Sequence, residues 1–150
     1  MSIDITTLLD EREITRSIFE FARAMDAREW DELHRIMTPD ATAELGTGTL
    51  RGPAEVVASI RSFIDECGPT QHLLGNLTVK VNSEGVSSQT SIRASHRGSG
   101  SLQQETYECM GYYRDTWQQT PAGWRISHRA MVVNFEFGSR KVLGPKIESH

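Results

Sequence analysis

The stretch "PTQHLLGNLTVKV", residues 69–81, marks a change in the character of the chain. Before it, apolar residues recur every three or four positions, which is the spacing of an amphipathic helix. From His72 onward, runs that favour strands alternate with short turns of Gly, Ser and Asn, which is typical of antiparallel strands. Helices that precede a set of strands, rather than alternating with them, predict an α+β fold. We expect the helices to cover one face of a strongly curved sheet.

Three helices are expected before this stretch. The apolar residues of the first are Ile5, Leu8, Leu9, Ile14, Ile18, Phe21 and Met25. The second follows Asp26, which we interpret as an N-cap because Glu29 lies three residues later, and it stops at residues 38–40. The third begins near Pro53, a residue favoured in the first turn of a helix. Between the second and third helices, residues 41–52 can form a short hairpin.

Four longer strands are expected at residues 72–81, 86–97, 104–119 and 124–137. Side chains alternate between the two faces of a strand, so one face of each strand should point at the helices. The residues assigned to this inner face are Ile92, Ala94, His96, Tyr107, Cys109, Gly111, Tyr113, Trp124, Ile126, His128, Ala130 and Val132. An inner face with two histidines, two tyrosines and a glycine predicts the lining of a small-molecule pocket rather than an aliphatic core.

The opposite face of the sheet is expected to be polar. Its members on two of the strands are Arg93, Ser95, Arg97, Arg125, Ser127 and Arg129. We expect this open face to pack against a second copy of the chain, giving a homodimer or a higher homo-oligomer. The alternative is a monomer whose polar face is solvated.

Length and composition restrict the function classes. The chain has 150 residues, which indicates one domain over 1–150, with a core of about 10–137 and a polar tail over 138–150. A net charge of −4 gives no basic surface for nucleic acid. The beginning of the chain has neither a leader pattern nor a long apolar run, so we expect a cytoplasmic protein without membrane contact. Cys67 and Cys109 have no metal or redox spacing and should be free thiols, and no cofactor or metal motif is present.

The candidate chemistry rests on a pair of residues rather than on any single one. Taken alone, His72, His96 or His128 is as well explained by packing, and Asp26 by helix capping. If the helices fold over the sheet, however, Asp26 could accept a hydrogen bond from one nitrogen of His72. A carboxylate in that position fixes the tautomer of the ring and stabilises the imidazolium that forms. The other nitrogen would then serve as a general base without a cofactor.

Several motifs resemble scytalone dehydratase and SnoaL-like proteins. "AMDAREWDELHRIMTPDA" resembles the segment in which an aspartate precedes a W-x-x-L helix, and "TQHLLGN" resembles the T-Q-H-F-I-G-G of the dehydratase. "SHRGS" lies where that family has a second histidine, and "GWRISHRAMV" resembles its last strand. The resemblance covers about Arg12 to Phe137. It implies the nuclear transport factor two-like fold, in which a cone-shaped sheet is closed by three helices. Hexachlorocyclohexane dehydrochlorinase resembles this chain at the same aspartate and histidine.

The resemblance also implies roles for individual residues. His72 corresponds to the base, Asp26 to its orienting partner, and His96 to a second histidine that assists proton abstraction or polarises the substrate. The substrate-binding residues that we expect are Tyr107, Tyr113, Met25, His128 and Trp30. The dehydratase has a tyrosine where this chain has Met25, and its second water-holding tyrosine has no match near Ala43–Leu45. Dehydration of scytalone itself is therefore not expected, although a tyrosine from the sheet could take over that role.

Three functions remain open at the level of the sequence. The leading interpretation is a cofactor-independent lyase or isomerase, in which the Asp26–His72 pair removes a proton from a small, mostly apolar cyclic molecule. The second is a polyketide cyclase of the SnoaL type that uses an acidic residue as its base. The third is a non-catalytic ligand-binding or accessory domain, because one fold hosts many functions.

Overall fold

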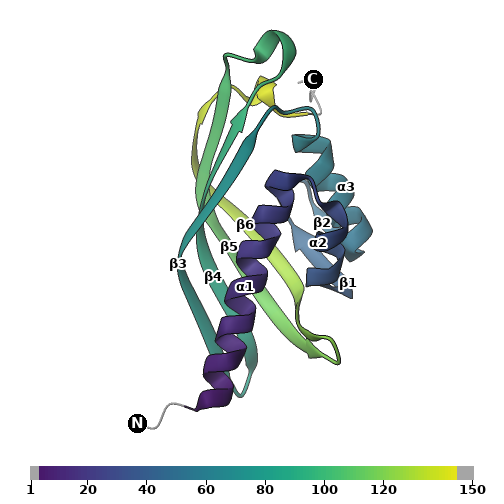
Figure 1. Ribbon diagram of the computed structural model, residues 1–150, viewed down its shortest axis with the longest axis vertical. Helices are drawn as coiled ribbons and strands as arrows, with labels where there is room; N and C mark the ends of the chain where they lie inside the picture. Colours follow the sequence, from purple (N-terminus) through teal and green to yellow (C-terminus); the bar gives the residue numbers. More distant parts are fainter. Residues whose placement is uncertain (1–3, 145–150) are drawn as a thin grey trace.

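The computed structural model describes residues 4–144 and is shown in Figure 1. Its elements are helices α1 (Ile5–Ala27), α2 (Trp30–Ile36) and α3 (Gly52–Ile64), strands β1 (Met37–Glu44), β2 (Thr49–Arg51), β3 (Thr70–Asn82), β4 (Gly85–Arg97), β5 (Thr106–Thr120) and β6 (Gly123–Gly138), and the 3-10 turns η1 (Gly100–Leu102) and η2 (Arg140–Val142). The expected helices and long strands are all present, and β1 and β2 form the expected hairpin, although β1 already begins at Met37 and so includes residues 38–40, where the second helix was expected to stop.

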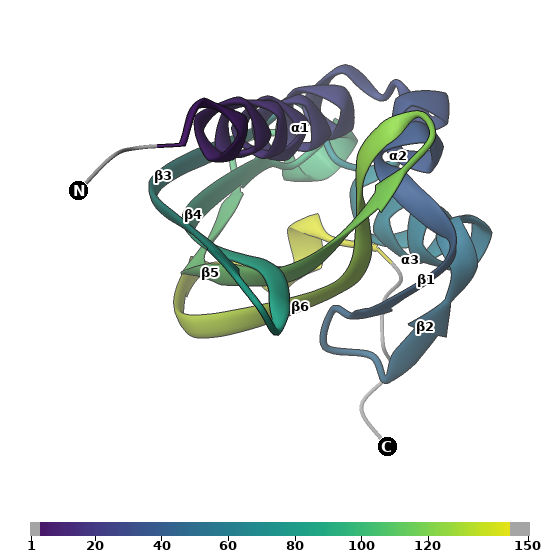
Figure 2. The same ribbon diagram turned by 90° about the horizontal axis from the view of Figure 1, so that it is seen from below.

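The six strands form one sheet in the order β2-β1-β6-β5-β4-β3. Neighbouring strands are antiparallel except for β1 and β6, which are parallel. Figure 2 shows the sheet curving around the space beside α1, with α3 lying near β1 and β2. The α+β prediction is confirmed. Within residues 4–144 the sheet is nevertheless open, because β2 and β3 are its edges, so the predicted cone is a curved sheet that does not close.

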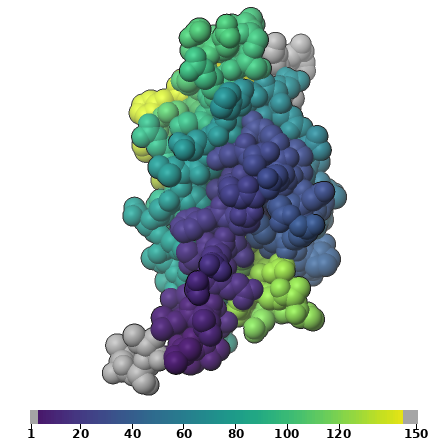
Figure 3. All heavy atoms as spheres, in the orientation of Figure 1, coloured from purple at the N-terminus to yellow at the C-terminus, as the bar shows by residue number. Residues whose placement is uncertain are grey.

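Helix α1 crosses the inner face of the sheet and packs mainly on β3. Figure 3 shows it as the purple band running along the teal strands. The helix begins after Asp4, whose carboxylate accepts a hydrogen bond from the backbone N–H of Thr6 at 3.0 Å. Its buried stripe includes Ile18 and Phe21. It ends at Arg28, which has the left-handed conformation with φ of 60°.

The predicted N-cap role of Asp26 is wrong. Asp26 lies in the last turn of α1, and Glu29 holds the N-cap position of α2 without a side-chain hydrogen bond. The capping pattern records only the types of residue and their spacing. It does not show that α1 continues to Ala27, nor that the carboxylate of Asp26 has better partners on β3.

A β-bulge at Ser127 changes which face the residues of β6 occupy. Ile126 pairs with Trp117 of β5, but the next pair is His128 with Thr116, so Ser127 is an extra residue on β6. One additional residue moves every following side chain to the opposite face. A second register shift beside Val133 leaves Asn134 without a partner on β5 and reverses the alternation again.

Four assignments made from the sequence are corrected by this bulge. Ala130 and Val132, expected on the inner face, pair with the outward-facing Arg114 and Tyr112. His128, expected on the inner face, lies half-buried on the outer face, where its Nδ1 and the Thr42 hydroxyl are 2.7 Å apart. Arg129, expected on the outer face, is buried inside the molecule. It therefore cannot contribute to a contact with a second copy. Strict alternation from Trp124 onward could not reveal an extra residue in the strand.

Buried Arg129 forms a bidentate ion pair with Asp115 of β5. Its Nε and Nη2 donate to the two carboxylate oxygens at 2.7 Å and 2.8 Å. The guanidinium also lies 4.3 Å from the ring centre of Phe21 and 4.1 Å from that of Tyr113. Such a charge is tolerated in an interior only when it is paired and hydrogen-bonded. Because Phe21 belongs to α1, the arginine links the helix to the sheet.

Strand β3 contains a bulge of its own. Gly75 pairs with Ser91 of β4 and Thr78 with Gln89, so two residues of β3 face one of β4. Asn76, inside this bulge, has a positive φ of 47°. Asparagine tolerates that conformation better than most residues with a side chain. The bulge divides the edge strand into two short ladders.

The buried apolar residues form two clusters. The larger lies between the three helices and strands β1, β5 and β6, and includes Phe21 and Trp117. The smaller lies on the inner face of β4 and β5 and includes Tyr107, Tyr113 and Val142. Val142 belongs to η2, so the packed part of the chain extends beyond the expected limit of 137. The remainder of the expected tail, residues 145–150, lies outside the described residues.

The buried ion pair gives a prediction about stability. Asp115→Ala should lower the free energy of unfolding by about 3–5 kcal/mol, measured by urea denaturation, because it leaves the Arg129 charge buried without a partner. Glu108→Ala is the matched control, since it breaks the exposed pair with Arg93 on the outer face. That change should cost less than about 1 kcal/mol. Equal losses in the two variants would contradict the importance of the buried pair.

Candidate active site

Asp26 is held against the beginning of β3 by three hydrogen bonds. Its Oδ1 lies 2.7 Å from Nδ1 of the His72 ring and accepts from the Thr70 hydroxyl at 2.9 Å. Its Oδ2 accepts from the backbone N–H of His72 at 2.9 Å. These residues come together because the last turn of α1 packs on β3. The structure thus brings together the two residues on which the proposed chemistry depends.

Asp26 is ionised and defines the tautomer of His72. Burial tends to raise the pKa of Asp26, but the hydrogen bonds from the His72 ring and backbone and from Thr70 outweigh it and hold the pKa below its ordinary value. A carboxylate only accepts hydrogen bonds, so Nδ1 of His72 carries the proton as long as Oδ1 of Asp26 is held against it. Nε2 of the neutral ring is then left with its lone pair. No hydrogen-bond partner for Nε2 is found among residues 4–144.

His96 lies beside His72 on the next strand. The two ring centres are 5.5 Å apart and the rings are nearly perpendicular. Nδ1 of His96 is 3.2 Å from the backbone carbonyl of Tyr107, which can only accept, so this nitrogen carries the proton. Burial, followed by the neighbouring His72, lowers the pKa of His96 to about 4. His96 is therefore neutral near pH 7.

The two expected tyrosines have different surroundings on the same inner face. The Tyr107 hydroxyl donates to Glu136 of β6 at 2.5 Å. Burial and this carboxylate raise the pKa of Tyr107. Tyr113 lies over the Arg129 guanidinium, and burial raises its pKa as well. Both phenols are therefore protonated near neutral pH and can act as hydrogen-bond donors.

The other expected substrate-binding residues, Met25, Trp30 and His128, lie in three different environments. Met25 is buried directly before Asp26. Trp30 is half-buried on α2, where it packs against the larger core cluster and lies 5.5 Å from the Arg61 guanidinium. His128 is on the outer face, as described above.

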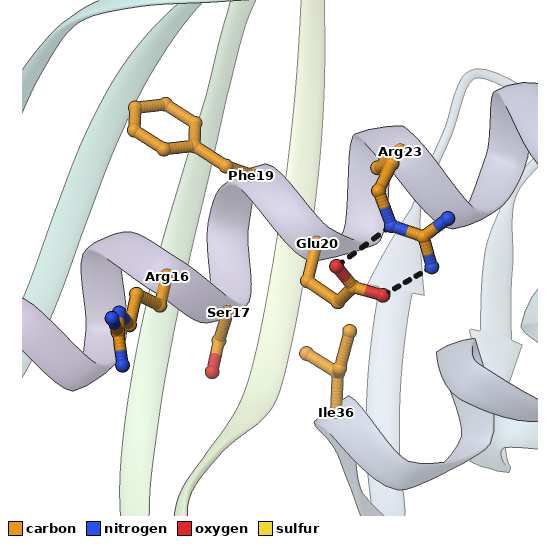
Figure 4. Close-up of a pocket in the computed structure, with 6 residues that line it drawn as sticks. All are labelled: Arg16, Ser17, Phe19, Glu20, Arg23 and Ile36. Carbon is orange, nitrogen blue, oxygen red and sulfur yellow. Dashed lines mark hydrogen bonds and ion pairs between the residues drawn. The ribbon is translucent and has the colours of Figure 1, made fainter.

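The described surface hollows lie away from Asp26 and His72. One, of about 580 Å³, follows the outside of α1 and is shown in Figure 4; its lining residues are Arg16, Ser17, Phe19, Glu20, Arg23 and Ile36. Another, of about 760 Å³, lies on the outer face of the sheet and includes Lys80, Arg114 and His128. The inner pocket predicted from the sequence therefore stays a prediction. The His72 side chain itself is only 7% exposed.

The sequence predicted no metal site, two free thiols and no membrane contact. Residues 4–144 contain no group of three or more histidine, cysteine or acidic side chains placed to hold a metal ion. Cys67 and Cys109 are free thiols, and burial raises the pKa of each. Within the same part of the chain, no helix combines the length and apolarity that a membrane crossing needs.

Sequence reasoning missed several residues that surround the pair. Thr70 was part of the quoted "TQH" motif, but its hydroxyl was given no role. Arg28 was given no role, although its guanidinium donates to the Thr70 hydroxyl at 2.8 Å. Arg129 was placed on the wrong face. The available signal for Thr70 was its position two residues before His72, which puts both side chains on one face of the strand.

Comparison with known proteins agrees with this architecture. The profile of the SnoaL-like domain matches residues 6–130. The chain belongs to the SnoaL-like domain family. It is also 29% identical over 136 residues to the uncharacterised protein Rv2910c of Mycobacterium tuberculosis, covering 89% of this chain and 92% of that protein.

Solved structures show the same fold at lower sequence identity. A hexachlorocyclohexane dehydrochlorinase, LinA type 2, superposes with a TM-score of 0.81 at 16% identity, covering 98% of this chain and all of that one (100%). A candidate scytalone dehydratase from Novosphingobium aromaticivorans gives a TM-score of 0.77 at 18% identity, covering 97% and 98%. The fold is nuclear transport factor two-like, as expected from the sequence motifs.

The depressed pKa of His96 predicts a pH-dependent stability. The unfolded ring takes up its proton near 6.5 and the folded ring only near 4, so its contribution is complete above 6.5 and is lost as the pH falls to 4. From about pH 7.5 to about pH 5 the loss from this group should be about 2 kcal/mol. Urea denaturation of wild type and His96→Gln at the two pH values measures it. The variant should lose less stability on acidification, and identical losses would contradict the prediction.

Proposed function

We propose that this SnoaL-like protein is a cofactor-independent lyase or isomerase in which Nε2 of His72 removes a proton from carbon in a small, mostly apolar cyclic molecule. The observation that carries the proposal is the 2.7 Å contact between Asp26 and Nδ1 of His72. An ionised aspartate on Nδ1 leaves Nε2 as the basic nitrogen and stabilises the imidazolium once the proton has moved.

In the proposed step, the lone pair of Nε2 forms the new N–H bond as the substrate C–H bond breaks. In the first outcome, the electron pair of the C–H bond forms a double bond and a leaving group departs with its bonding pair. In the second outcome, the carbanion is delocalised and takes up a proton at another carbon. A general base of this kind needs a proton that is already acidic, such as one next to a carbonyl or on a hydroaromatic ring. The two outcomes correspond to a lyase and an isomerase.

His96 supports the abstraction step better than it supports polarisation of a carbonyl. With its proton on Nδ1 facing the Tyr107 carbonyl, the neutral ring has no proton on Nε2 to donate. Its pKa of about 4 keeps the ring neutral beside the imidazolium that forms on His72. The protonated Tyr113 hydroxyl is the better candidate for a donor to a substrate oxygen, because Tyr107 already donates its single proton to Glu136.

The names of two structural neighbours are compatible with this chemistry. One is a dehydrochlorinase of hexachlorocyclohexane and the other a candidate scytalone dehydratase. Loss of hydrogen chloride or of water from a ring requires removal of a proton from carbon. At these identities the neighbours support the fold, and the reaction is our proposal from the Asp26–His72 geometry.

A non-catalytic binding or accessory role is the second candidate. It is favoured by the burial of His72 and by the position of the described hollows away from it. The SnoaL-type cyclase alternative, with an acidic base, fits less well. The Asp26 carboxylate already accepts three hydrogen bonds, which reduces its availability as a base.

We also propose that the outer face of the sheet pairs with a second copy of the chain. An apolar patch there consists of Leu73, Met110, Tyr112, Val132, Phe135 and Phe137. Leu73, Phe135 and Phe137 are exposed, and the two phenylalanine rings stack edge-to-face at 5.6 Å. Register places Leu73, Arg93, Met110 and Phe135 in one row across four strands. A row of this kind is suited to sheet-on-sheet packing.

The assembly prediction is tested by sedimentation at micromolar concentration. Wild-type protein should sediment as a dimer or larger species, heavier than 16.8 kDa. Phe135→Lys should shift it toward the monomer because it places a charge in the apolar patch. Leu9→Lys, which changes an exposed apolar residue on α1, is the matched control. A wild-type protein found only as the monomer would refute the assembly.

The catalytic prediction needs an assay that does not depend on the leaving group. Small cyclic carbonyl and hydroaromatic compounds are incubated with the protein in D₂O, and NMR records the exchange of carbon-bound protons and the formation of products. For a compound that reacts, His72→Ala should lower kcat/KM by ~10²- to 10⁴-fold, because a positioned general base contributes that much. Asp26→Asn should be comparably damaging, because it releases the wrong tautomer.

His128→Ala is the control for this experiment, because His128 lies on the outer face of the sheet. It should retain wild-type turnover. Near-wild-type turnover in His72→Ala would show that the base is assigned wrongly. Tight binding of a compound without exchange or product would favour the binding-domain alternative instead.

A further inference from the structure

The Arg28 side chain connects the end of α1 with the end of α3 and with the segment that leads into β3. Nη1 donates to the Met25 carbonyl at 2.9 Å and to the Thr70 hydroxyl at 2.8 Å. Nη2 donates to the carbonyls of Ile64 and Gly68, each at 3.1 Å. These partners lie at the ends of α1 and α3, in the turn before β3, and at the beginning of β3 itself. One guanidinium thus holds the end of the helix to the start of the sheet.

The bond to Thr70 also defines a direction. A guanidinium can only donate, so the Thr70 oxygen accepts from Arg28. The single proton of that hydroxyl is then free to point at Asp26 Oδ1, where the oxygen–oxygen distance is 2.9 Å. The same Oδ1 receives the proton of His72 Nδ1. Arg28 therefore donates to the Thr70 hydroxyl, and this hydroxyl donates to the Asp26 carboxylate. The Nδ1–H of His72 donates to the same carboxylate oxygen.

We propose that Arg28 is a positioning residue that acts through the Thr70 hydroxyl to hold the Asp26 carboxylate as an acceptor, and thereby selects the Nδ1–H tautomer of His72. We call this arrangement the Arg28–Thr70 relay. It rests on the proposed function for its catalytic meaning, since it determines which nitrogen of His72 is basic. As a statement about hydrogen bonding, it can be tested without any substrate.

The relay differs from a purely structural clamp in what Thr70 contributes. If Arg28 only joined the helix and the sheet, its bonds to the Met25, Ile64 and Gly68 carbonyls would be sufficient, and the Thr70 hydroxyl would be dispensable. Thr70→Val retains the shape of the side chain and those carbonyl bonds, but removes the hydroxyl. Thr70→Ser retains the hydroxyl. The two variants separate the relay from the clamp.

The experiment is ¹⁵N NMR of the histidine ring nitrogens at about pH 8, where an ordinary histidine is neutral. Wild type and Thr70→Ser should show His72 with the proton on Nδ1 and an unprotonated Nε2. Thr70→Val and Arg28→Lys should show a measurable loss of the Nδ1–H form, with the Nε2–H signal appearing. The His96 signals serve as the internal reference, because their partner is the Tyr107 carbonyl. Urea denaturation confirms that each variant is folded.

The outcomes are distinct. An unchanged His72 tautomer in folded Thr70→Val and folded Arg28→Lys overturns the relay. If one variant does not fold, the other decides. A shifted tautomer in Thr70→Val with rescue in Thr70→Ser supports the relay, whether or not an enzymatic activity has been found.

Activity then tests the catalytic meaning separately. With a reacting compound from the D₂O screen, Thr70→Val should lower kcat/KM on the order of tenfold, as expected for a hydrogen-bond partner one step removed from the reacting group. If Thr70→Val shifts the tautomer while His72→Ala remains active, the relay stands and the proposed function fails. If the tautomer is unchanged while His72→Ala is inactive, the function stands and the relay fails.

Discussion

The carboxylate of Asp26 fixes where the end of α1 can lie. It accepts hydrogen bonds from a side chain and a backbone N–H that are 46 residues away along the chain. A half-buried carboxylate without such partners would be destabilising, so these hydrogen bonds favour an arrangement in which the helix end meets the beginning of β3. Two residues after Asp26, the left-handed Arg28 caps α1, with its backbone N–H donating to the carbonyls of Ala24 and Met25. The position of the end of α1 and the tautomer of His72 depend on the same carboxylate.

A second constraint is the buried ion pair beneath α1. Arg129 and Asp115 form a buried pair, with the arginine between the rings of Phe21 and Tyr113. The pair lies on the inner face only because Ser127 shifts the register of β6. A local irregularity in one strand thus brings a full positive charge beneath α1. The inner face consequently contains a buried ion pair in addition to its apolar residues.

Most of the architecture could be predicted from the sequence, because it depends on local patterns. Periodicity located the helices, turn residues located the strands, and Pro53 marked the start of α3. The Asp26–His72 contact could be expected because two separate motifs pointed to it. Features that depend on a single extra residue or on distant contacts could not be predicted from the sequence. A bulge leaves no mark on the alternation that precedes it, so His128 and Arg129 were assigned to the wrong faces, and the parallel pairing of β1 with β6 depends on contacts that are distant in sequence. The role of Arg28 depends on where the carbonyls of α3 and the following turn lie, which no local pattern records.

The bulge at Asn76 also influences how this protein avoids unwanted association. β3 is a free edge of the sheet, and an uninterrupted edge of 13 residues would offer a template for another strand. The bulge divides that edge into one ladder over residues 70–75 and another over residues 78–82, whose backbone groups are out of step. Continuous pairing with a strand from another molecule is therefore disfavoured along this edge. Because the exposed Leu73 lies on this edge strand, the interruption limits the length of edge that could act as a template for amyloid-like growth.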